Sequence, residues 1–295
     1  MNEQLQIETP VGRFAAIDFG GEGPDVLLIH QVTANAQTWA PLAPHLTAFC
    51  HPVAVDLRGH GQTEAALEGA FDIVADLVHV AEALGMRRPL LLTEGSDLLM
   101  LAGGDLRALD PLGVVNVGIT CTSRGEDAQT WFVEQYGTDE VDVWEERFGL
   151  FASGTAQDKA DYLERTVDRA CRDWLVAGVS RPHWRAYLSR ALRDTAHGWE
   201  RRPQRAEYAA FVEAVQGRPM GLDLYDLCTA PLTFAATRQQ LSPGELLALD
   251  GYARDREDRS FEIIDGGAML TVMDAHGLRR VVRSVLLRMD QIEGF

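Results

Sequence analysis

Two groups of polar residues directly follow short apolar runs, which is where an α/β protein often places side chains that do chemistry. The run at 90–92 is followed by Glu94, Gly95, Ser96 and Asp97, and the run at 26–29 is followed by His30. A carboxylate that is partly desolvated has a raised pKa and can act as acid or base near neutral pH. A serine becomes a nucleophile only beside a base, and no base is visible near Ser96.

The elements that position these residues alternate between strand and helix patterns. Residues 5–9 and 13–19 alternate like a hairpin with its turn at 10–12. Apolar runs predict buried strands at 26–29, 52–55, 90–92, 114–119, 232–236 and 261–264. Helical spacing predicts helices at 70–85, 97–106, 243–254 and 278–289. This series predicts a mostly parallel sheet with helices on both faces, and ligands bind at the carboxyl edge of such sheets.

Residues 125–225 interrupt this alternation. The segment has charged helical patterns and no convincing strand, so we predict an all-helical insertion. It holds five of the six tryptophans, at positions Trp131, Trp144, Trp174, Trp184 and Trp199. Most of these should pack between helices, and one or two could line a ligand cavity. The predicted organisation is a core domain at 1–124 and 226–295 with a helical cap at 125–225.

Three stretches make the sequence similar to the α/β-hydrolases. Residues 26–30 with Trp39 resemble the third strand and oxyanion loop of that superfamily. The segment 56–63 reads Asp-Leu-Arg-Gly-His-Gly-Gln-Thr, close to the signature Asp-x-Arg-Gly-x-Gly-x-Ser/Thr. Residues 84–92 lie where the strand into the nucleophile elbow should be. The resemblance covers about 5–120 and 226–292, is strongest to the cap-bearing esterase and C–C hydrolase branch, and implies an α/β-hydrolase fold.

The resemblance implies a nucleophile on a Gly-x-Ser-x-Gly turn, and this chain departs from that pattern. If Ser96 is the nucleophile, Glu94 and Leu98 replace the flanking glycines, while Ala102 fits the small helix residue of the family. If Gly95 holds the nucleophile position, no nucleophile exists. Both registers stay open, and both make the elbow abnormal.

The other catalytic elements implied by the resemblance are also changed. The segment after 232–236 reads Thr-Arg-Gln-Gln, so Gln240 stands where the acid belongs and cannot stabilise an imidazolium by charge. Ala268 stands at the position of the base. The oxyanion loop opens with His30-Gln31 instead of His-Gly, and a Cβ at Gln31 can disturb the backbone donors. An engineered change at Ala268 alone would not explain the other losses.

The composition excludes several classes of partner. Forty-four acidic against 27 basic residues give a formal charge of −17, which repels phosphate backbones and anionic lipid. The four cysteines are far apart and lack metal-ligand spacing, so we expect free thiols and no metal. No apolar stretch of about 18 residues and no signal-peptide pattern is present, so we expect a soluble, cytoplasmic protein without nucleic-acid or membrane partners.

These observations favour a divergent α/β-hydrolase-fold protein without a Ser-His-Asp triad. In one version it is a non-hydrolytic acid–base enzyme, of lyase, cyclase or isomerase type, acting on a small hydrophobic substrate in secondary metabolism without a cofactor. In the second version it is a pseudoenzyme that binds a small ligand or a protein partner. A weak esterase that uses Ser96 is a third reading. A homodimer stays open.

The candidate catalytic residues are Glu94, Ser96 and His30. The alternative for His30 is a structural imidazole that holds its loop, and the alternative for Glu94 is a solvated or salt-bridged carboxylate in a remodelled turn. The predicted pocket residues are Gln31, Trp39, Gly95, Asp97 and Ala268.

Overall fold

The computed structural model describes residues 2–65, 72–95, 106–118, 120–215, 218–267, 269 and 274–293. Ser96, Asp97 and Ala268 lie outside these residues, as does nearly all of the helix predicted at 97–106. The predictions that concern those positions therefore stay predictions.

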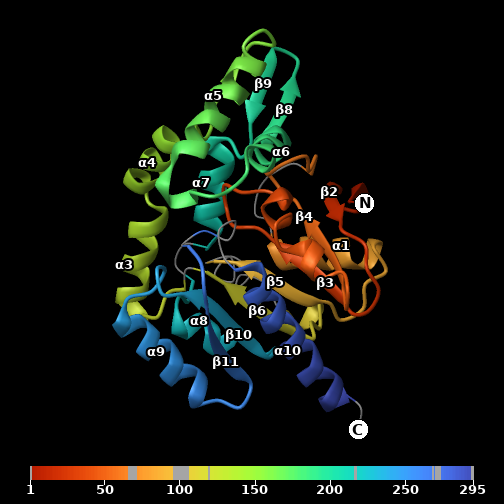
Figure 1. The fold of residues 1–295 in the computed structure, drawn as a ribbon, viewed down its shortest axis with the longest axis vertical. Helices are drawn as coiled ribbons and strands as arrows, with labels where there is room; N and C mark the ends of the chain where they lie inside the picture. The colour runs from red at the N-terminus through yellow and green to blue at the C-terminus, as the bar shows by residue number, and fades with distance from the viewer. Residues whose placement is uncertain are drawn as a thin grey trace.

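An eight-stranded sheet forms the centre of the molecule, in the order β1-β2-β4-β3-β5-β6-β10-β11 (Figure 1). Its strands are β1 (Glu3–Thr9), β2 (Gly12–Asp18), β3 (Asp25–Ile29), β4 (His51–Val55), β5 (Leu90–Glu94), β6 (Gly113–Val117), β10 (Leu232–Thr237) and β11 (Arg259–Ile264). β2 pairs antiparallel with β1 and β4, and the other neighbours run parallel. The carboxyl ends of β3, β4, β5, β6, β10 and β11 therefore meet at one edge.

Helices cover both faces of the sheet, which is why its central strands are apolar along their whole length. Along β3, Leu27 and Ile29 belong to one buried cluster and Val26 and Leu28 to the other. The first cluster packs against α1 (Ile73–Ala83), α8 (Leu222–Leu227) and α9 (Pro243–Arg254). The second packs against α10 (Ala275–Glu293) and the 3-10 helices η1 (Ala36–Trp39) and η2 (Ala43–His45). A third 3-10 helix, η3, spans Leu106–Ala108.

Local signals set the ends of these elements. The Asp72 carboxylate accepts hydrogen bonds from two N–H groups of the first turn of α1, and Gly85 follows that helix with φ +68°. Ser242 and Glu245 form a capping box at the start of α9. The predicted hairpin is confirmed, with Thr9 opposite Gly12 around its two-residue turn.

The segment between β6 and β10 corrects the prediction of an all-helical insertion. We call residues 125–215 the inserted segment. Its helices are α3 (Gly125–Tyr136), α4 (Thr138–Phe148), α5 (Lys159–Arg172), η4 (Trp174–Val176), α6 (Arg181–Ala191) and α7 (Arg205–Val215). It also contains a small antiparallel sheet of β7 (Ser153–Gly154), β9 (Gly198–Arg201) and β8 (Leu192–Thr195).

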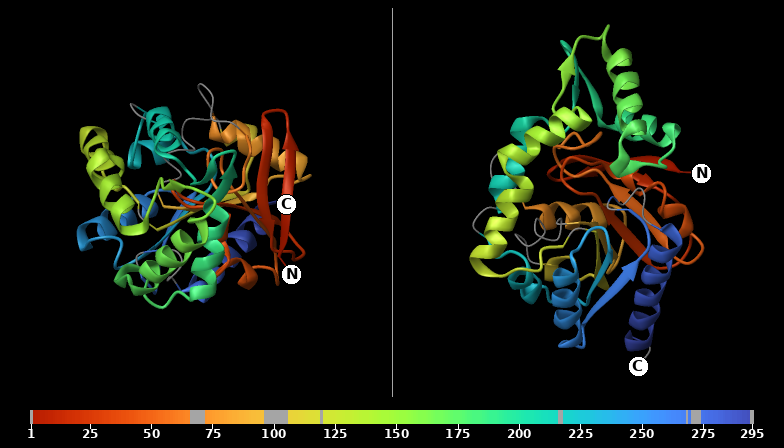
Figure 2. Two further views of the ribbon diagram at one scale, coloured as in Figure 1. Left: turned by 90° about the horizontal axis from the view of Figure 1, so that it is seen from above. Right: turned by 60° about the vertical axis from the view of Figure 1, so that its left-hand side comes forward.

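The β8–β9 hairpin was missed because its strands have four residues each and are mostly polar. A period of two cannot be recognised over so short a stretch when it lies among charged helices. Gly198 is required at the turn, since a Cβ there would lie 2.0 Å from the carbonyl oxygen of Gly154. The hairpin projects away from the large sheet (Figures 1 and 2). Among the described residues, no helix is both long and apolar enough to cross a bilayer.

Candidate acid–base site at the carboxyl edge of the sheet

Glu94 is the last residue of β5, and only 6% of it is exposed. The Thr38 hydroxyl on η1 donates a long hydrogen bond of 3.4 Å to Glu94 Oε2, and the backbone N–H of Gln31 donates to the same carboxylate. No ion pair of Glu94 with a basic side chain is found in the described part of the chain. Burial raises the pKa of the Glu94 carboxyl from 4.5 to about 7, because two hydrogen bonds do not offset its desolvation.

A carboxyl group with a pKa near 7 is present in both protonation states at neutral pH. It can therefore accept a proton and return it without a large free-energy penalty in either direction. The candidate acid–base role of Glu94 rests on this property.

Gly95 follows β5 directly and has φ +65°, in the left-handed region that favours glycine. Its N–H donates to the carbonyl oxygen of Val117 and continues the pairing of β5 with β6. The chain therefore turns sharply at the end of the strand, at the first residue after Glu94.

His30 is completely buried at the end of β3, and both of its ring nitrogens bind backbone. Nδ1 donates to the carbonyl oxygen of Gln31 at 2.8 Å, and Nε2 accepts from the N–H of Leu57 at 3.0 Å. These partners assign the tautomer. Burial lowers the pKa of His30 to about 4, so the ring is neutral at neutral pH. In this conformation His30 joins the loops after β3 and β4, which is the structural role that the sequence left open.

Asp56 organises the loop after β4. Its carboxylate accepts from the N–H groups of Ala36 at 2.7 Å and Gln62 at 2.8 Å. It also pairs with the Arg190 guanidinium of α6 at 2.9 Å. Gly61 is needed here, because a Cβ at that position would lie 2.2 Å from the Asp56 carboxylate. The spacing of the Asp-x-Arg-Gly-x-Gly motif thus follows from the space around one buried carboxylate.

The other polar residues of this motif are also structural. His60 is fully buried, with Nδ1 donating to the Arg58 carbonyl oxygen at 2.9 Å and Nε2 accepting from the N–H of Thr33 at 3.3 Å. Arg58 pairs with Asp76 of α1 through two hydrogen bonds. These contacts fix the loop against the first helix.

α6 packs on the 3-10 helix η1, whose Thr38 binds Glu94, and sequence reasoning missed this contact. The Asn35 amide donates to the backbone oxygen of Tyr187 at 3.1 Å, so α6 packs on η1. Burial raises the pKa of the Tyr187 hydroxyl, the Arg201 guanidinium opposes this rise, and the carboxylates of Glu94 and Asp56 add to it. No sequence signal links Tyr187 to Glu94, because the two residues belong to different parts of the chain.

Comparison with solved structures covers nearly the whole chain. An E-2-(acetamidomethylene)succinate hydrolase is 15% identical with a TM-score of 0.68, covering 97% of this chain and 99% of that one. The thioesterase domain from the curacin biosynthetic pathway is 16% identical with a TM-score of 0.67, covering 96% and 99%. The enol-lactonase from Burkholderia xenovorans LB400 is 15% identical with a TM-score of 0.62, covering 96% and 100%. The chain has the α/β-hydrolase fold.

Sequence comparison is more limited. No family model matches the chain. Protein phosphatase methylesterase 1 of Bos taurus is 33% identical over 89 residues, which cover 28% of this chain and 23% of that protein. An uncharacterized protein of Mycobacterium bovis is 36% identical over 83 residues, covering 28% and 22%. The chain thus spans less than a quarter of the length of these curated relatives.

In this α/β-hydrolase fold, the loops after β10 and β11 are held together by neutral groups. The Gln240 side chain accepts from the N–H of Thr237 at 2.8 Å, and the Thr237 hydroxyl donates to the carbonyl oxygen of Gly267 at 3.2 Å. The described residues 237–240 and 265–267 contain one carboxylate, Asp265, which is exposed. Gln240, predicted at the position of the acid, therefore has a loop-holding role here.

Trp39 is one of the predicted pocket residues, and its place in a pocket stays a prediction. It is fully buried in the apolar cluster between the sheet and α10. Gln31 is partly exposed, and its place in a pocket stays a prediction. Of the predicted catalytic and pocket residues, the structure brings Gln31, Glu94 and Gly95 together, and His30 lies beneath them with both nitrogens occupied.

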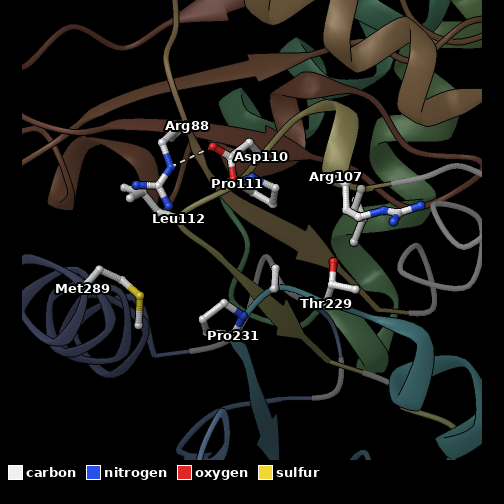
Figure 3. A pocket seen from close by; sticks show the side chains of 10 residues that line it. Arg88, Arg107, Asp110, Pro111, Leu112, Thr229, Pro231 and Met289 are labelled. Atoms are coloured by element: carbon white, nitrogen blue, oxygen red, sulfur yellow. Dashed lines mark ion pairs between the residues drawn. The ribbon is translucent and has the colours of Figure 1, made fainter. Parts of the chain in front are cut away.

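A pocket of about 260 Å³ lies at the opposite edge of the sheet, before the starts of β5, β6 and β10 (Figure 3). Its wall is apolar around Leu112, Pro231 and Met289, and Arg88 pairs with Asp110 at its rim at 3.0 Å. This pocket contains none of the predicted site residues. The described residues also contain no cluster of three or more His, Cys, Asp or Glu side chains that could hold a metal ion.

Proposed function

We propose that this protein is a non-hydrolytic acid–base enzyme, of lyase, cyclase or isomerase type, that acts on a small hydrophobic substrate. Glu94 is the residue that moves the proton. The observation that carries the proposal is the buried Glu94 carboxyl at the carboxyl edge of the sheet, with burial raising its pKa to about 7. Perturbed carboxyl groups of this kind concentrate at functional sites.

Serine-hydrolase chemistry fits the site less well. We propose that Gly95 stands at the apex of the elbow, since its φ of +65° directly after β5 matches the sharp turn that this position requires. A glycine there supplies no nucleophile. The described loop 238–242 after β10 supplies no carboxylate to orient a base, and both nitrogens of His30 are engaged.

We further propose that the inserted segment acts as a cap over this edge. The Arg190–Asp56 ion pair and the Asn35–Tyr187 hydrogen bond join α6 to the loops that surround Glu94. The protein is proposed to work in the cytoplasm, because its four cysteines are free thiols, as is usual in a reducing compartment. We also propose that the protein acts in secondary metabolism and forms a homodimer.

The first chemical step of such an enzyme is proton abstraction from a carbon acid. The ketone 2-tetralone is a suitable test compound, because it is small and apolar and has C–H groups beside a carbonyl. In deuterated water, the protein should accelerate exchange of these protons, measured by proton NMR. The rate should rise with pH through about 7, since the ionised Glu94 is the base.

The Glu94→Gln variant should slow this exchange by about 100-fold or more, because an amide cannot accept the proton. The matched control is Glu82→Gln on α1, whose side chain is 73% exposed, and it should leave the rate unchanged. Exchange that is equally fast in wild type and Glu94→Gln would refute the proposed role of Glu94.

The second candidate is a binding protein without turnover. The observation in its favour is that both donors beside Glu94, Thr38 and the Gln31 N–H, bind its carboxylate rather than facing an empty site. Saturable quenching of tryptophan fluorescence by 2-tetralone, without any catalysed exchange, would favour this candidate over the enzyme. Labelling of Ser96 by a fluorophosphonate would instead favour the esterase reading.

A further inference from the structure

β11 is the last strand at one side of the large sheet, and α9 and α10 lie on its two faces (Figure 1). Such an edge strand presents backbone N–H and C=O groups that its own sheet does not use, so a further strand can pair with it. The register identifies these groups. Leu232 of β10 lies opposite Arg259, and its N–H donates to the Asp258 carbonyl oxygen. Because alternate residues of β11 bind β10, the backbone groups of Phe261 and Ile263 point to the outer side.

No described segment uses the outer side of β11. Within the described part of the chain, no hydrogen bond involves the outward N–H or C=O groups of Phe261 and Ile263. The Ile263 side chain is 43% exposed, and Phe261 is only partly buried. Natural edge strands that stay in water are usually protected by charge, proline or a covering element. The apolar pair on β11 instead favours contact with another strand.

The two faces of β11 carry different side chains. Phe261 packs against the buried cluster on the α9 side, and Ile264 belongs to the cluster on the α10 side. Since side chains alternate along a strand, Ser260 and Glu262 share the face of Ile264. On this face the Arg288 guanidinium of α10 donates to the Ser260 hydroxyl at 3.3 Å. The α10 face of the edge strand therefore carries a cation beside Ser260 and an anion at Glu262.

These two charges distinguish β11 from the edge strand at the other side of the sheet. Glu262 and Arg288 are both exposed, and neither forms an ion pair with another described residue. The charged residues of β1 are Glu3 and Glu8, which are both acidic, and Glu8 already pairs with Arg13 at 2.6 Å. β11 thus offers one charge of each sign to a second copy of the chain, and β1 does not.

We propose that β11 forms the homodimer interface, and that the β11 strands of two copies pair antiparallel about a twofold axis at Phe261. The axis is perpendicular to the sheet, so each face of one strand continues as the same face of the other. Ser260 then lies opposite the partner's Glu262, which brings that carboxylate beside Arg288. The same ion pair forms twice. This inference rests on the proposed homodimer and is independent of the proposed chemistry.

The charges select this register. Since the faces must match, the axis passes through a residue and not between two residues. An axis at Glu262 would place the two Glu262 carboxylates opposite each other, and an axis at Ser260 would place Glu262 opposite Asp258. Like charges directly opposite destabilise a strand pair. An axis at Phe261 pairs opposite charges, and it places Phe261 and Ile263 of both copies in one apolar group on the α9 face, because diagonal neighbours also interact.

The first test exchanges the charges at exposed positions. Sedimentation velocity over a concentration series gives the dimer Kd of wild type, Glu262→Arg, Arg288→Glu and the double variant. Each single substitution should raise Kd by about tenfold or more, because it replaces two opposite-charge pairs by like-charge pairs. The double variant should restore the dimer, since it forms the reversed pairs.

Arg283→Glu is the matched control for the change in net charge. Arg283 is an exposed residue of the same helix, five positions before Arg288. Its side chain therefore points about 140° away from Arg288 around the helix axis. This variant changes the net charge by the same amount as Arg288→Glu and should leave Kd unchanged.

The second test measures the register directly. In Phe261→Cys the two new cysteines face each other across the axis, with Cα atoms about 5.5 Å apart, which a disulfide can bridge. Oxidation should give a cross-linked dimer on a non-reducing gel. In Ile263→Cys the two cysteines lie four residue spacings apart, about 14 Å, and should not cross-link. Both variants are made with Cys171→Ser, because Cys171 is the exposed native cysteine.

The outcomes separate the interface from the homodimer itself. A dimer whose Kd is unchanged in both single charge variants, or that cross-links through Ile263→Cys and not Phe261→Cys, would overturn the interface alone. Two weakened single variants without restoration in the double variant would overturn the charge pairing and its register. A protein that is monomeric at every concentration would overturn both the interface and the homodimer, and the role of Glu94 would still be decided by the deuterium exchange.

Discussion

The loops after β3 and β4 differ sharply from the ends of β5, β10 and β11, although all lie at one edge of the sheet. In the first region Asp56 accepts from two N–H groups and pairs with Arg190, and both ring nitrogens of His30 and of His60 bind backbone groups. In the second region Glu94 has a long 3.4 Å hydrogen bond from Thr38 and one from a backbone N–H, and no described basic side chain forms an ion pair with it. We call the first region the satisfied frame, because its carboxylate and imidazole groups have hydrogen-bond partners. The second region holds an under-satisfied carboxyl group, that of Glu94.

This difference shows how one fold can retain its frame and change its chemistry. The contacts of Asp56 and His30 hold backbone, so a change there would disturb several segments together. At the ends of β5 and β10, Glu94 binds the Thr38 hydroxyl and the Gln31 N–H, and Gln240 binds the N–H of Thr237. None of these contacts pairs strands of the sheet, so the identity of these side chains can change while the sheet persists. Groups that are buried without full compensation lower stability and are retained mostly where function uses them.

The largest expected effect is on the satisfied frame. Asp56→Asn leaves the buried Arg190 guanidinium without its counter-charge. It also replaces one carboxylate oxygen by an NH2 group, which cannot accept a hydrogen bond from the backbone N–H that faces it. We expect a loss of about 3–5 kcal/mol in the free energy of unfolding, measured by urea titration. The control Asp110→Asn removes the exposed pair with Arg88, and it should cost at most about 1 kcal/mol. Equal costs for the two variants would break the comparison.

The next effect concerns the under-satisfied carboxyl group. The pKa of Glu94 rises from 4.5 to about 7 on folding, so the folded state binds the proton more tightly than the unfolded state. The stability that this tighter proton binding contributes to the folded state is fully present below pH 4.5 and is lost as the pH rises through about 7. A shift of this size corresponds to about 3 kcal/mol. Glu94→Gln should therefore gain stability relative to wild type by up to that amount between about pH 4.5 and 8.

The measurement is thermal or urea unfolding of both proteins at several pH values. The exposed Glu82→Gln variant should show no such pH-dependent difference. If the stability difference between wild type and Glu94→Gln were constant across this range, the carboxyl group would have an ordinary pKa, and the contrast between the two regions would disappear.

The smallest expected effect is that of restoring one catalytic residue. Ala268→His supplies an imidazole at the predicted position of the base, but the acid and the elbow remain changed, and triad members act as a unit. We expect no measurable hydrolysis of short acyl esters, as in the unchanged protein. A large gain of esterase activity would show that the ends of β5 and β10 are intact as hydrolase elements.

Much of the frame could be predicted from local sequence. The apolar runs predicted strands at 26–29 and 90–92, which lie within β3 and β5, and helical spacing predicted α9 at its observed bounds. The Asp-x-Arg-Gly-x-Gly motif identified the loop after β4. These predictions succeeded because side-chain period and capping act over a few residues.

The contacts between the core and the inserted segment could not be predicted in this way. Arg190 and Asp56 are 134 residues apart, and nothing in either local pattern indicates the other. The hydrogen bond from the Asn35 amide to the Tyr187 backbone oxygen also spans 152 residues. The β8–β9 hairpin was too short and polar to show its period.

The sequence by itself determined the residue types at the sheet edge: a carboxylate at the end of β5 with a glycine after it, a histidine after β3, and no acid directly after β10. Only the tertiary structure decided what these residues can do. Burial makes His30 a neutral, doubly bonded support with a pKa of about 4 and gives Glu94 a pKa of about 7. The reason is that desolvation and hydrogen bonding depend on every segment packed around a group, and those segments come from distant parts of the chain.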